Sequence, residues 1–418
     1  MWEQVDESFW KENRRSQVDE VADAVQDIID LVRLEGDKAL FDLTFKFDKT
    51  ALDELEVSRD EIEEAYDEVD PVLLDELENA AEYIQRFHEL QVPDDLWLRE
   101  VEPGIVLGAK STPLERVGCY IPGGRASYPS TALMCIIAAR VAGVGEVICC
   151  TPPPADPLTL VAMDIAGADE IYKVGGAQAV AAMALGTESI EPVQKIVGPG
   201  NVYVTAAKML LRKYVEIDFP AGPSEIGVLA DETANAEFVA ADLLAQAEHD
   251  PSSACILITT DPKLPDDVWS YMEEQMKNAP RKEIMLTALR NSGYIVEEDI
   301  ELAAEIMNGI APEHLSIQVK DPLDILSKIT NAGSIFVGPY TPIAAGDYAS
   351  GTNHVLPTAG HAATMSGLNV AHFRKTSTIQ MISKDGLSLL APTISAIAKA
   401  EGLYAHSDSV KIRGKKQG

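Results

Sequence analysis

Amide and imidazole side chains lie close together at the end of one amphipathic segment. The apolar residues of 236–249 recur at helical spacing, and the segment closes on Gln246 and His249. Residues three apart share one face of a helix, so we expect these two side chains to lie side by side. Nitrogen and oxygen donors without thiolates fit a catalytic zinc with an open position, or a harder divalent cation. The alternative is a solvated helix face whose last His interacts with the helix dipole.

Two further places carry residues that can move a proton or hold a ligand. Glu313 and His314 follow a proline, and a carboxylate beside an imidazole provides two proton carriers. A helix start with an acidic first turn explains this pair equally well. The stretch 346–357 is rich in glycine and polar residues, as functional loops often are. Within it, Asp347 is a candidate ligand, and His354 is either a ligand or a satisfied loop residue.

The elements that must position these residues alternate between strands and helices. Between residues 117 and 197, short apolar runs and helical patterns follow one another as in βαβ units, and glycines close several strands. Residues 225–337 repeat the alternation around the 236–249 helix. Ligands of open α/β sheets bind at the carboxyl ends of the strands, where these glycine turns lie. No full G-x-G-x-x-G is present, and the turns fit tight connections almost as well as phosphate binding.

We therefore predict an α/β fold with two Rossmann-like parallel-sheet domains, a small N-terminal helical arm and a C-terminal tail segment. Most of the first hundred residues have helical patterns, and Ser58 with Glu61 predicts a helix that begins with a capping box. The predicted parts are an arm (1–20), a discontinuous first α/β domain with the metal and catalytic residues (21–117 and 225–372), a second α/β domain with an incomplete Rossmann pattern (118–224), and a helical tail (373–418).

Composition excludes several classes of partner. The formal net charge is −33, whereas nucleic acids and anionic membranes are bound through basic patches, so we expect neither as a partner. No run of eighteen apolar residues is present and the chain starts with polar and acidic residues, so we expect no membrane span or signal peptide. The five cysteines show no CxxC spacing, which indicates reduced thiols and a cytoplasmic location.

Several strings, taken together, identify a family. In their order and spacing, over about residues 20–410, they resemble histidinol dehydrogenases. The strings are Tyr120-Ile121-Pro122-Gly123-Gly124, Gly175-Gly176-Ala177-Gln178-Ala179, Gly198-Pro199-Gly200-Asn201, Ala221-Gly222-Pro223-Ser224-Glu225, Gln246-Ala247-Glu248-His249-Asp250, Pro312-Glu313-His314-Leu315 and the stretch from Gly346-Asp347 to Leu356-Pro357-Thr358.

The resemblance implies a zinc- and NAD-dependent enzyme that oxidises L-histidinol through L-histidinal to L-histidine, the last step of histidine biosynthesis. It also implies a homodimer with shared active sites and one zinc ion per subunit, and it makes 118–224 the NAD-binding domain. The residues that match the family's functional positions are the zinc ligands Gln246, His249, Asp347 and, from the tail of the partner subunit, His406; the catalytic pair Glu313 and His314; the substrate contacts Ser224, Gln246, His249, His314, Asp347, Glu401 and His406; and the NAD contacts Tyr120, Gln178 and Asn201.

Three alternatives stay open at this point. The stretch 359–372 carries extra histidines and fits the family pattern less closely, so a related zinc and NAD oxidoreductase acting on another small primary alcohol is one alternative. A zinc hydrolase, for which Glu313 and a metal would suffice, is another and would not need NAD. The third is a catalytically silent binding protein, which the presence of both catalytic residues and all four matched ligands disfavours.

Overall fold

The structure is a computed structural model, and it describes residues 2–6, 9–10, 18–123, 127–220 and 222–414. The chain forms two compact units. The first unit spans 1–91 and 115–373, and the second spans 92–114 and 374–418. The first unit contains two parallel sheets, here called sheet A and sheet B, and the second contains the antiparallel sheet C. The predicted α/β class with two parallel sheets is therefore confirmed.

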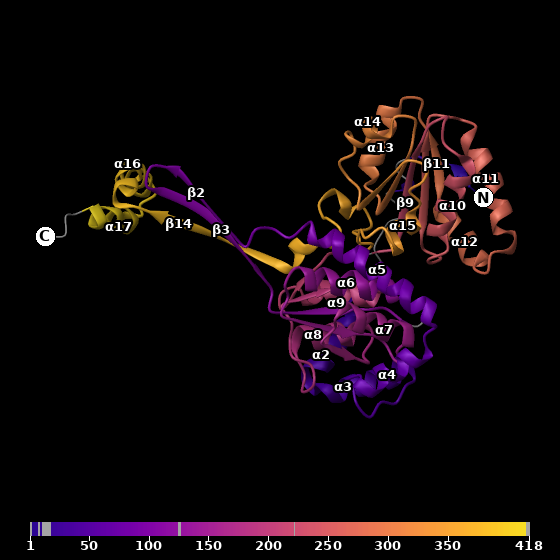
Figure 1. Cartoon of the computed structure of the whole chain (residues 1–418), viewed down its shortest axis with the longest axis horizontal. Helices are drawn as coiled ribbons and strands as arrows, with labels where there is room; N and C mark the ends of the chain where they lie inside the picture. Colours follow the sequence, from indigo (N-terminus) through magenta and orange to yellow (C-terminus); the bar gives the residue numbers. More distant parts are fainter. Residues whose placement is uncertain (1, 7–8, 11–17, 124–126, 221, 415–418) are drawn as a thin grey trace. The chain divides into compact units, whose positions relative to one another are not determined.

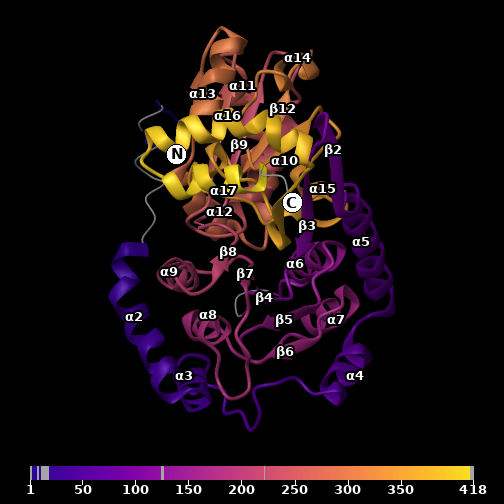
Figure 2. The same cartoon turned by 90° about the vertical axis from the view of Figure 1, so that its left-hand side faces the viewer.

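Sheet B has parallel strands in the order β6-β5-β4-β7-β8, with helices on both faces (Figure 2). Helices α8 and α9 pack against each other and against α2, while α6 and α7 pack together and contact α5 and α4. The elements are β4 (Arg116–Tyr120), β5 (Glu146–Cys150), β6 (Glu170–Tyr172), β7 (Lys195–Val197), β8 (Glu216–Ile217), α2 (Val18–Glu35), α3 (Asp37–Asp48), α4 (Arg59–Glu68), α5 (Pro71–Glu89), α6 (Pro129–Val141), α7 (Pro157–Ala166), α8 (Gly176–Leu185) and α9 (Val202–Leu211).

The N-terminal helices belong to the core of sheet B. Val25 and Ile29 of α2 and Leu40 of α3 are fully or almost fully buried and share one apolar cluster with Ile148 of β5 and Val180 of α8. This grouping differs from the expected one, which joined 21–117 to 225–372. The physical reason is the apolar stripe of α2, which packs against α8 and α9 rather than against the helices of sheet A.

Sheet A has parallel strands in the order β1-β11-β10-β9-β12-β13. Its strands β9 and β11 lie between helix α13 (Ile300–Ile310) on one side and helix α11 (Leu264–Gln275) on the other (Figure 1). Its central strands are buried on both faces, as expected for a parallel sheet covered by helices. Alternate residues point to opposite faces: Leu257 of β10 joins the cluster with α10 and α11, and Ile256 joins the cluster with α13. The strands are β1 (Glu3–Gln4), β9 (Glu225–Ala230), β10 (Ala254–Thr259), β11 (Gly293–Val296), β12 (His314–Gln318) and β13 (Ser334–Val337).

The helical segments associated with sheet A connect these strands or follow the last of them. They are α10 (Ala236–Ala247), α11 (Leu264–Gln275), η1 (Met276–Asn278), α12 (Lys282–Ala288), η2 (Leu289–Asn291), α13 (Ile300–Ile310), α14 (Pro322–Leu326), α15 (Ile343–Tyr348), η3 (His361–Ala363) and η4 (Val370–Phe373). The helix predicted over 236–249 is thus present, although it ends two residues before His249.

The described part of the N-terminal arm packs on sheet A. Strand β1 pairs in parallel with β11, and the Trp2 ring meets Trp269 and Tyr294 edge-on at centroid distances of 6.4 and 6.1 Å. Trp10 is buried in the cluster around α13. The arm was predicted as helical and as packing on the protein or on a second subunit. The described part does pack on its own chain and is helical at residues 9–10, whereas residues 3–4 form a strand that extends sheet A. Residues 7–8 and 11–17 lie outside the described part.

In the second unit, sheet C has the order β14-β3-β2 and all pairs are antiparallel. Its elements are β2 (Leu96–Glu102), β3 (Ile105–Pro113), β14 (Arg374–Ile382), α16 (Lys384–Ala400) and α17 (Tyr404–Gly414). The tail predicted as helical from 373 therefore begins with a strand. Arg374 fixes its start, because the guanidinium bonds to the Ser111 hydroxyl at 2.8 Å and pairs with Asp95.

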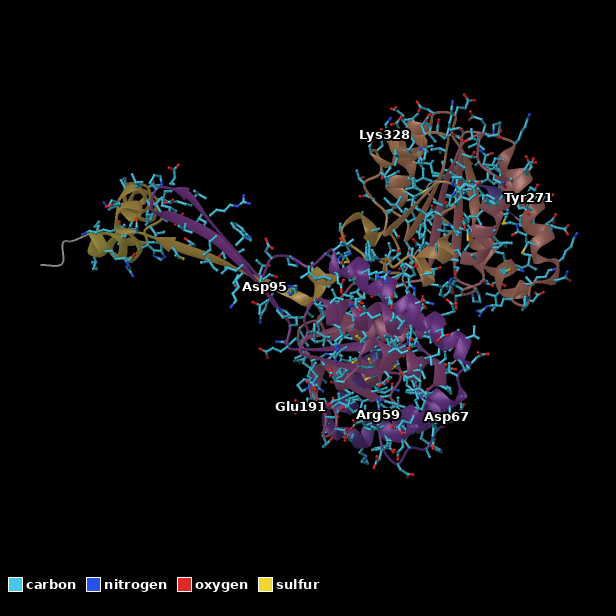
Figure 3. The ribbon with its side chains drawn as sticks, in the orientation of Figure 1. Arg59, Asp67, Asp95, Glu191, Tyr271 and Lys328 are labelled. Carbon is cyan, nitrogen blue, oxygen red and sulfur yellow. The ribbon has the colours of Figure 1, made fainter. Side chains whose placement is uncertain are left out.

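The surface and the helices fit the compositional expectations. Charged side chains such as Asp67, Glu191 and Arg59 project from the surface around sheet B (Figure 3). Over the part of the chain that the structure describes, none of the helices has the length and apolar character needed to cross a bilayer. All five cysteines are buried and none forms a disulfide.

Candidate functional site

The acid and imidazole pair lies at the amino edge of sheet A. His314 is the first residue of β12 and pairs in register with Ile226 of β9, so Glu313 and His314 stand beside Glu225. The pair therefore begins a strand, and the alternative of a helix start is wrong. Helix α10 follows β9 and runs back along the sheet, so its C-terminal residues return to this amino edge.

The main chain of Glu225 holds both members of the pair. Its N–H donates to Glu313 Oε2 at 2.8 Å, and its carbonyl oxygen lies 3.3 Å from His314 Nδ1. A carbonyl can only accept, so Nδ1 carries the proton and donates. The His314 Nε2 atom is then left facing Asp347, whose Oδ1 lies 3.6 Å away. Within the described residues, this buried Nε2 has no hydrogen-bond partner.

The pKa values of this group reflect burial and mutual charge. Burial raises the pKa of Glu313 to about 7, with the neighbouring His314 and the Glu225 N–H acting in the opposite direction. Burial alone would lower the pKa of His314, but the carboxylates of Glu313 and Asp347 outweigh it and raise that pKa to about 9. The pKa of Asp347 falls below its ordinary value, because His314, His354 and His249 outweigh the effect of burial. The site thus favours an ionised Asp347 facing a basic imidazole.

The three matched metal donors of the first unit come from two helices. Gln246 is in the last turn of α10 and 2% exposed, and its amide nitrogen has no hydrogen-bond partner within the described part of the chain. His249 lies just beyond the helix and is exposed, with its N–H donating to the Gln246 carbonyl at 3.3 Å. Asp347 is the fifth residue of the short helix α15.

The buried side-chain amide of Gln246, whose nitrogen has no hydrogen-bond partner within the described residues, indicates that this set of donors fits a ligand. An unpaired buried amide is costly, and its oxygen and nitrogen can exchange places by rotation, so a cation could take the oxygen. Gln, His and Asp supply the oxygen and nitrogen donors that zinc accepts. No group of three or more His, Cys, Asp or Glu suited to a metal occurs among the described residues. This result is expected for the four matched ligands. Gln246 is not one of these residue types and His406 belongs to the second unit, so only His249 and Asp347 remain in the first unit.

His354 is a satisfied loop residue and supports Asp347. Its Nδ1 lies 2.8 Å from the Asp347 carbonyl oxygen, and its Nε2 lies 3.4 Å from the Thr131 hydroxyl of α6. The first contact is a donation from Nδ1–H, because the carbonyl only accepts. His354 therefore fixes the main chain at Asp347, and of the two interpretations that the sequence left open the satisfied loop residue holds.

Glu225 is a site residue that sequence reasoning did not single out beyond its place in a family string. Its carboxylate is 3% exposed and accepts from the Ala359 N–H at 3.1 Å, and the Thr358 hydroxyl accepts from the Gly222 N–H. The chain around Ser224, a predicted substrate contact, is thereby tied to the start of the 359–372 stretch. A signal was available, since a Glu opening a wholly apolar strand requires partners.

The three matched NAD positions meet at the carboxyl edge of sheet B. Tyr120 ends β4, and its hydroxyl accepts from the Gly176 N–H at the start of α8 at 3.0 Å. Gln178 is buried in the first turn of α8. Asn201 is the N-cap of α9, and its Oδ1 accepts from the N–H groups of Tyr203 and Val204. Helix N-termini attract phosphate groups, so this edge suits a dinucleotide.

Glu401 and His406 belong to the second unit, apart from the residues above. Glu401 is the C-cap of α16, and His406 is in the first turn of α17. Both are exposed. The structure therefore brings His249, Asp347 and the catalytic pair close to one another in the first unit, with Gln246 three residues before His249 at the end of α10. It presents Glu401 and His406 on the surface of the second unit.

Comparison with known proteins gives one family along the whole chain. The family model described as histidinol dehydrogenase matches residues 11–414. The chain is similar to histidinol dehydrogenase of Methanosarcina mazei, with 52% identity over 405 residues, 96% of this chain and 94% of that one. For histidinol dehydrogenase of Archaeoglobus fulgidus the identity is 50% over 411 residues, 97% and 99% of the two chains. A crystal structure of histidinol dehydrogenase from Elizabethkingia anophelis matches with a TM-score of 0.94 at 42% identity, covering 99% of this chain and 97% of that one.

Proposed function

This chain belongs to the histidinol dehydrogenase family of oxidoreductases, and we propose that it oxidises L-histidinol through L-histidinal to L-histidine with two molecules of NAD in succession. This reaction would be the final step of histidine biosynthesis. The observation that carries the proposal is the buried pair of Glu313 and His314, held by the two main-chain polar groups of Glu225 and facing Asp347. A carboxyl and an imidazole with different environments can act as separate proton carriers.

The residues proposed to hold zinc are Gln246, His249, Asp347 and His406. The buried free amide of Gln246 and the carboxylate of Asp347 support this choice. When bound, zinc would supply a Lewis acid that orients the imidazole and amino nitrogens of the substrate. Ser224 and Glu401 are the further proposed substrate contacts, and Gln246, His249, His314, Asp347 and His406 complete that set.

His314 is the proton acceptor of both oxidations. Its Nδ1–H is held by the Glu225 carbonyl, so in the unprotonated ring Nε2 is the atom that can take the substrate's hydroxyl proton. The share of this form grows as pH rises toward the His314 pKa of about 9. Asp347 lies beside Nε2 and stabilises the imidazolium that forms. NAD, bound near Tyr120, Gln178 and Asn201, would accept the hydride of each oxidation.

Glu313 is the base for the aldehyde step. Its buried carboxyl, with a pKa of about 7, can take a proton from water as the water oxygen bonds to the aldehyde carbon. Protonated His314 returns its proton to the aldehyde oxygen as water adds, so the hydrate is neutral and His314 is again a base. The hydrate then loses a hydroxyl proton to His314, and its hydride would pass to NAD, which yields the carboxylic acid of L-histidine. This acid releases one further proton to solvent and becomes the carboxylate. Burial of the pair favours keeping the reactive aldehyde bound between the two oxidations.

We propose that the working enzyme is a homodimer with shared sites, in the cytoplasm. Large apolar side chains are exposed on sheet C and its helices, and an exposed apolar surface of this kind indicates a protein partner. They include Leu96, Trp97, Val101, Met381, Leu389, Ile397, Leu403, Tyr404 and Ile412, which are 46–65% exposed. His406 lies among the last of these, so the partner's tail is the proposed source of this ligand. The five free, buried cysteines fit a reducing compartment.

The test is the stoichiometry of NADH formation. Purified protein with L-histidinol and NAD should give two NADH per histidinol, should lose activity with a chelator and should regain it with zinc. His314→Asn should stop both oxidations while leaving the fold intact. Reduction of NAD by another small primary alcohol but not by histidinol would contradict the substrate, and hydrolysis without any need of NAD would support a zinc hydrolase. No NAD reduction by any alcohol, despite bound zinc, would contradict the reaction type.

A further inference from the structure

A buried ion pair lies beneath the glycine turn that connects β7 to α9. Lys208 of α9 pairs with Asp218, which follows β8, and their side chains are only 3% and 1% exposed. The two side chains hydrogen-bond to the main-chain N–H and carbonyl of the same residue, Gly198. The Gly198 N–H donates to Asp218 Oδ2 at 2.8 Å, and Lys208 Nζ donates to the Gly198 carbonyl at 3.0 Å. Asp218 Oδ1 also accepts from the Phe219 N–H at 2.7 Å.

Stability alone does not account for this pair. Two charges lose their hydration when buried, and apolar residues of similar volume often stabilise a fold as well or better. The surroundings are suited to such residues, since Val204, Ala207 and Leu211 of the same helix are buried in one apolar cluster. The pair therefore has a cost that calls for another role. Within the part of the chain that the structure describes, the hydrogen bonds of its two side chains go to the main chain of Gly198 and Phe219.

Gly198 is a position that needs an external restraint. Its φ is +113°, a conformation open to glycine, and a Cβ there would lie 2.2 Å from the Tyr120 carbonyl oxygen. Glycine is also the residue with the greatest backbone freedom. Three residues further on, Asn201 caps α9. The conformation of Gly198 thus sets how the chain enters α9 and where Asn201 and the helix N-terminus lie relative to Tyr120.

We propose that Lys208 and Asp218 are positioning residues for the NAD site: a buried clamp on Gly198 that sets the N-terminus of α9 and Asn201 for the dinucleotide. The inference rests on the proposed function, because it assumes that NAD binds at this edge of sheet B. The pair is nearly inaccessible and its charges balance, so it acts through the main chain of Gly198 and not by contact with NAD. Its loss should weaken the binding of NAD and leave the catalytic pair in sheet A unaffected.

The test is a double variant, Lys208→Met with Asp218→Leu, measured in the full-length protein. Removing both charges avoids an unpaired buried ion, but the Gly198 N–H and carbonyl and the Phe219 N–H lose their partners. The variant should therefore fold with a melting temperature near or modestly below that of the wild type. We expect a roughly tenfold rise in the Kd and KM for NAD, the change that loss of well-placed hydrogen bonds produces. The KM for histidinol, and kcat at saturating NAD, should stay near the wild-type values.

A control is Arg116→Met, which removes the ion pairs with Glu146 and Glu170 at the opposite, amino end of β4 and should leave NAD binding unchanged. The outcomes separate the two proposals. If the wild type binds no NAD in a titration of its intrinsic fluorescence, the proposed function itself fails. If the wild type binds NAD and the double variant binds it equally well, the clamp is contradicted. A double variant that does not fold would assign the pair to stability and would also overturn the clamp.

Discussion

At the residue scale, one main-chain segment explains how two unlike proton carriers coexist. Glu225 donates through its N–H to Glu313 and accepts through its carbonyl from His314, so both side chains take their orientation from strand β9. A main-chain anchor of this kind does not depend on protonation and stays in place as the pair titrates. The two groups differ in their surroundings. Burial is the largest effect on Glu313 and raises its pKa, whereas two neighbouring carboxylates raise the pKa of His314.

Glu313→Gln should separate the two oxidations. Glutamine keeps an acceptor for the Glu225 N–H but cannot take a proton from water, so oxidation of supplied histidinal should fall by about 10²–10⁴-fold, the usual contribution of a general base. NADH formation from histidinol should continue for about one turnover per site in a pre-steady-state experiment, because its first step uses His314. Equal losses on histidinol and on histidinal would refute this division of roles.

The pH dependence gives a second measurement on the same variant. Burial raises the pKa of Glu313 to about 7, so the wild-type rate on histidinal should rise with pH through about 7, and the variant should lack this dependence. The effect on stability has the opposite sign. A carboxyl whose pKa is raised on folding contributes stability below its unfolded pKa and loses it as pH rises through about 7. The melting temperature of Glu313→Gln should therefore equal or exceed that of the wild type at pH 8, which excludes misfolding as the cause of lost activity.

Which site residues can be predicted from sequence depends on how far apart they are along the chain. Gln246 and His249 are adjacent on one helical segment, so their proximity follows from helix geometry. Glu225 and Glu313 are 88 residues apart and become neighbours only because β9 and β12 pair. The sequence pattern does not show which residues of β9 and β12 lie opposite each other. The carboxyl-edge rule applies to the glycine turns of the first α/β stretch and does not extend to this pair, which lies at the amino edge of sheet A.

At the scale of elements, capping residues and apolar spacing correctly predicted the helices and strands that depend on interactions between residues close in sequence. The capping box at Ser58 is present: the Ser58 hydroxyl accepts from the Glu61 N–H at 3.2 Å, and the Glu61 carboxylate accepts from the Ser58 N–H at 2.8 Å. The helices and strands of 117–197 are also where apolar spacing placed them. Sheet C was missed because β2 is exposed along its whole length, and because the other partner of β3, strand β14, lies more than 260 residues further along the chain.

Ser58→Ala should loosen α4 without affecting the active site. The loss of an N-cap hydroxyl typically costs about 1 kcal/mol, which corresponds to roughly fivefold faster hydrogen exchange of the α4 amides that open locally. Ser58→Asp retains an oxygen acceptor and should restore protection. Exchange in α10 should be the same in all three proteins, and a change confined to α10 would show that the cap is not the cause.

At the scale of the whole molecule, the proposed site includes residues of both units, which raises the question of which subunit would supply His406. The first unit carries Glu313, His314, Gln246, His249 and Asp347, and the second carries His406 on an exposed helix with an apolar surface. An apolar surface of this extent on so small a unit favours a partner, and a homodimer with reciprocal exchange of tails would cover two such surfaces at once. Placing the substitutions on one or on both chains of a dimer can show whether each site receives its tail from the partner chain or from its own chain.

The deciding experiment compares two heterodimers, each purified through two different affinity tags. In the first, one chain carries His314→Asn and the other His406→Asn. If tails are exchanged, the chain with intact His314 receives an intact tail, one of two sites is complete, and activity is about half of that of the wild-type dimer. If each chain completes its own site, neither site is complete and activity is absent.

The second heterodimer reverses these outcomes and serves as the control. One chain carries both substitutions and the other carries none. With exchanged tails, the unmodified chain receives the defective tail and the modified chain lacks His314, so no site is complete. With self-completed sites, the unmodified chain works alone and about half of the activity remains. Because the two heterodimers contain the same substitutions in equal number, a general loss of stability affects both alike, and only the origin of His406 can make one active and the other silent. An active monomer of the wild type would contradict the shared site outright.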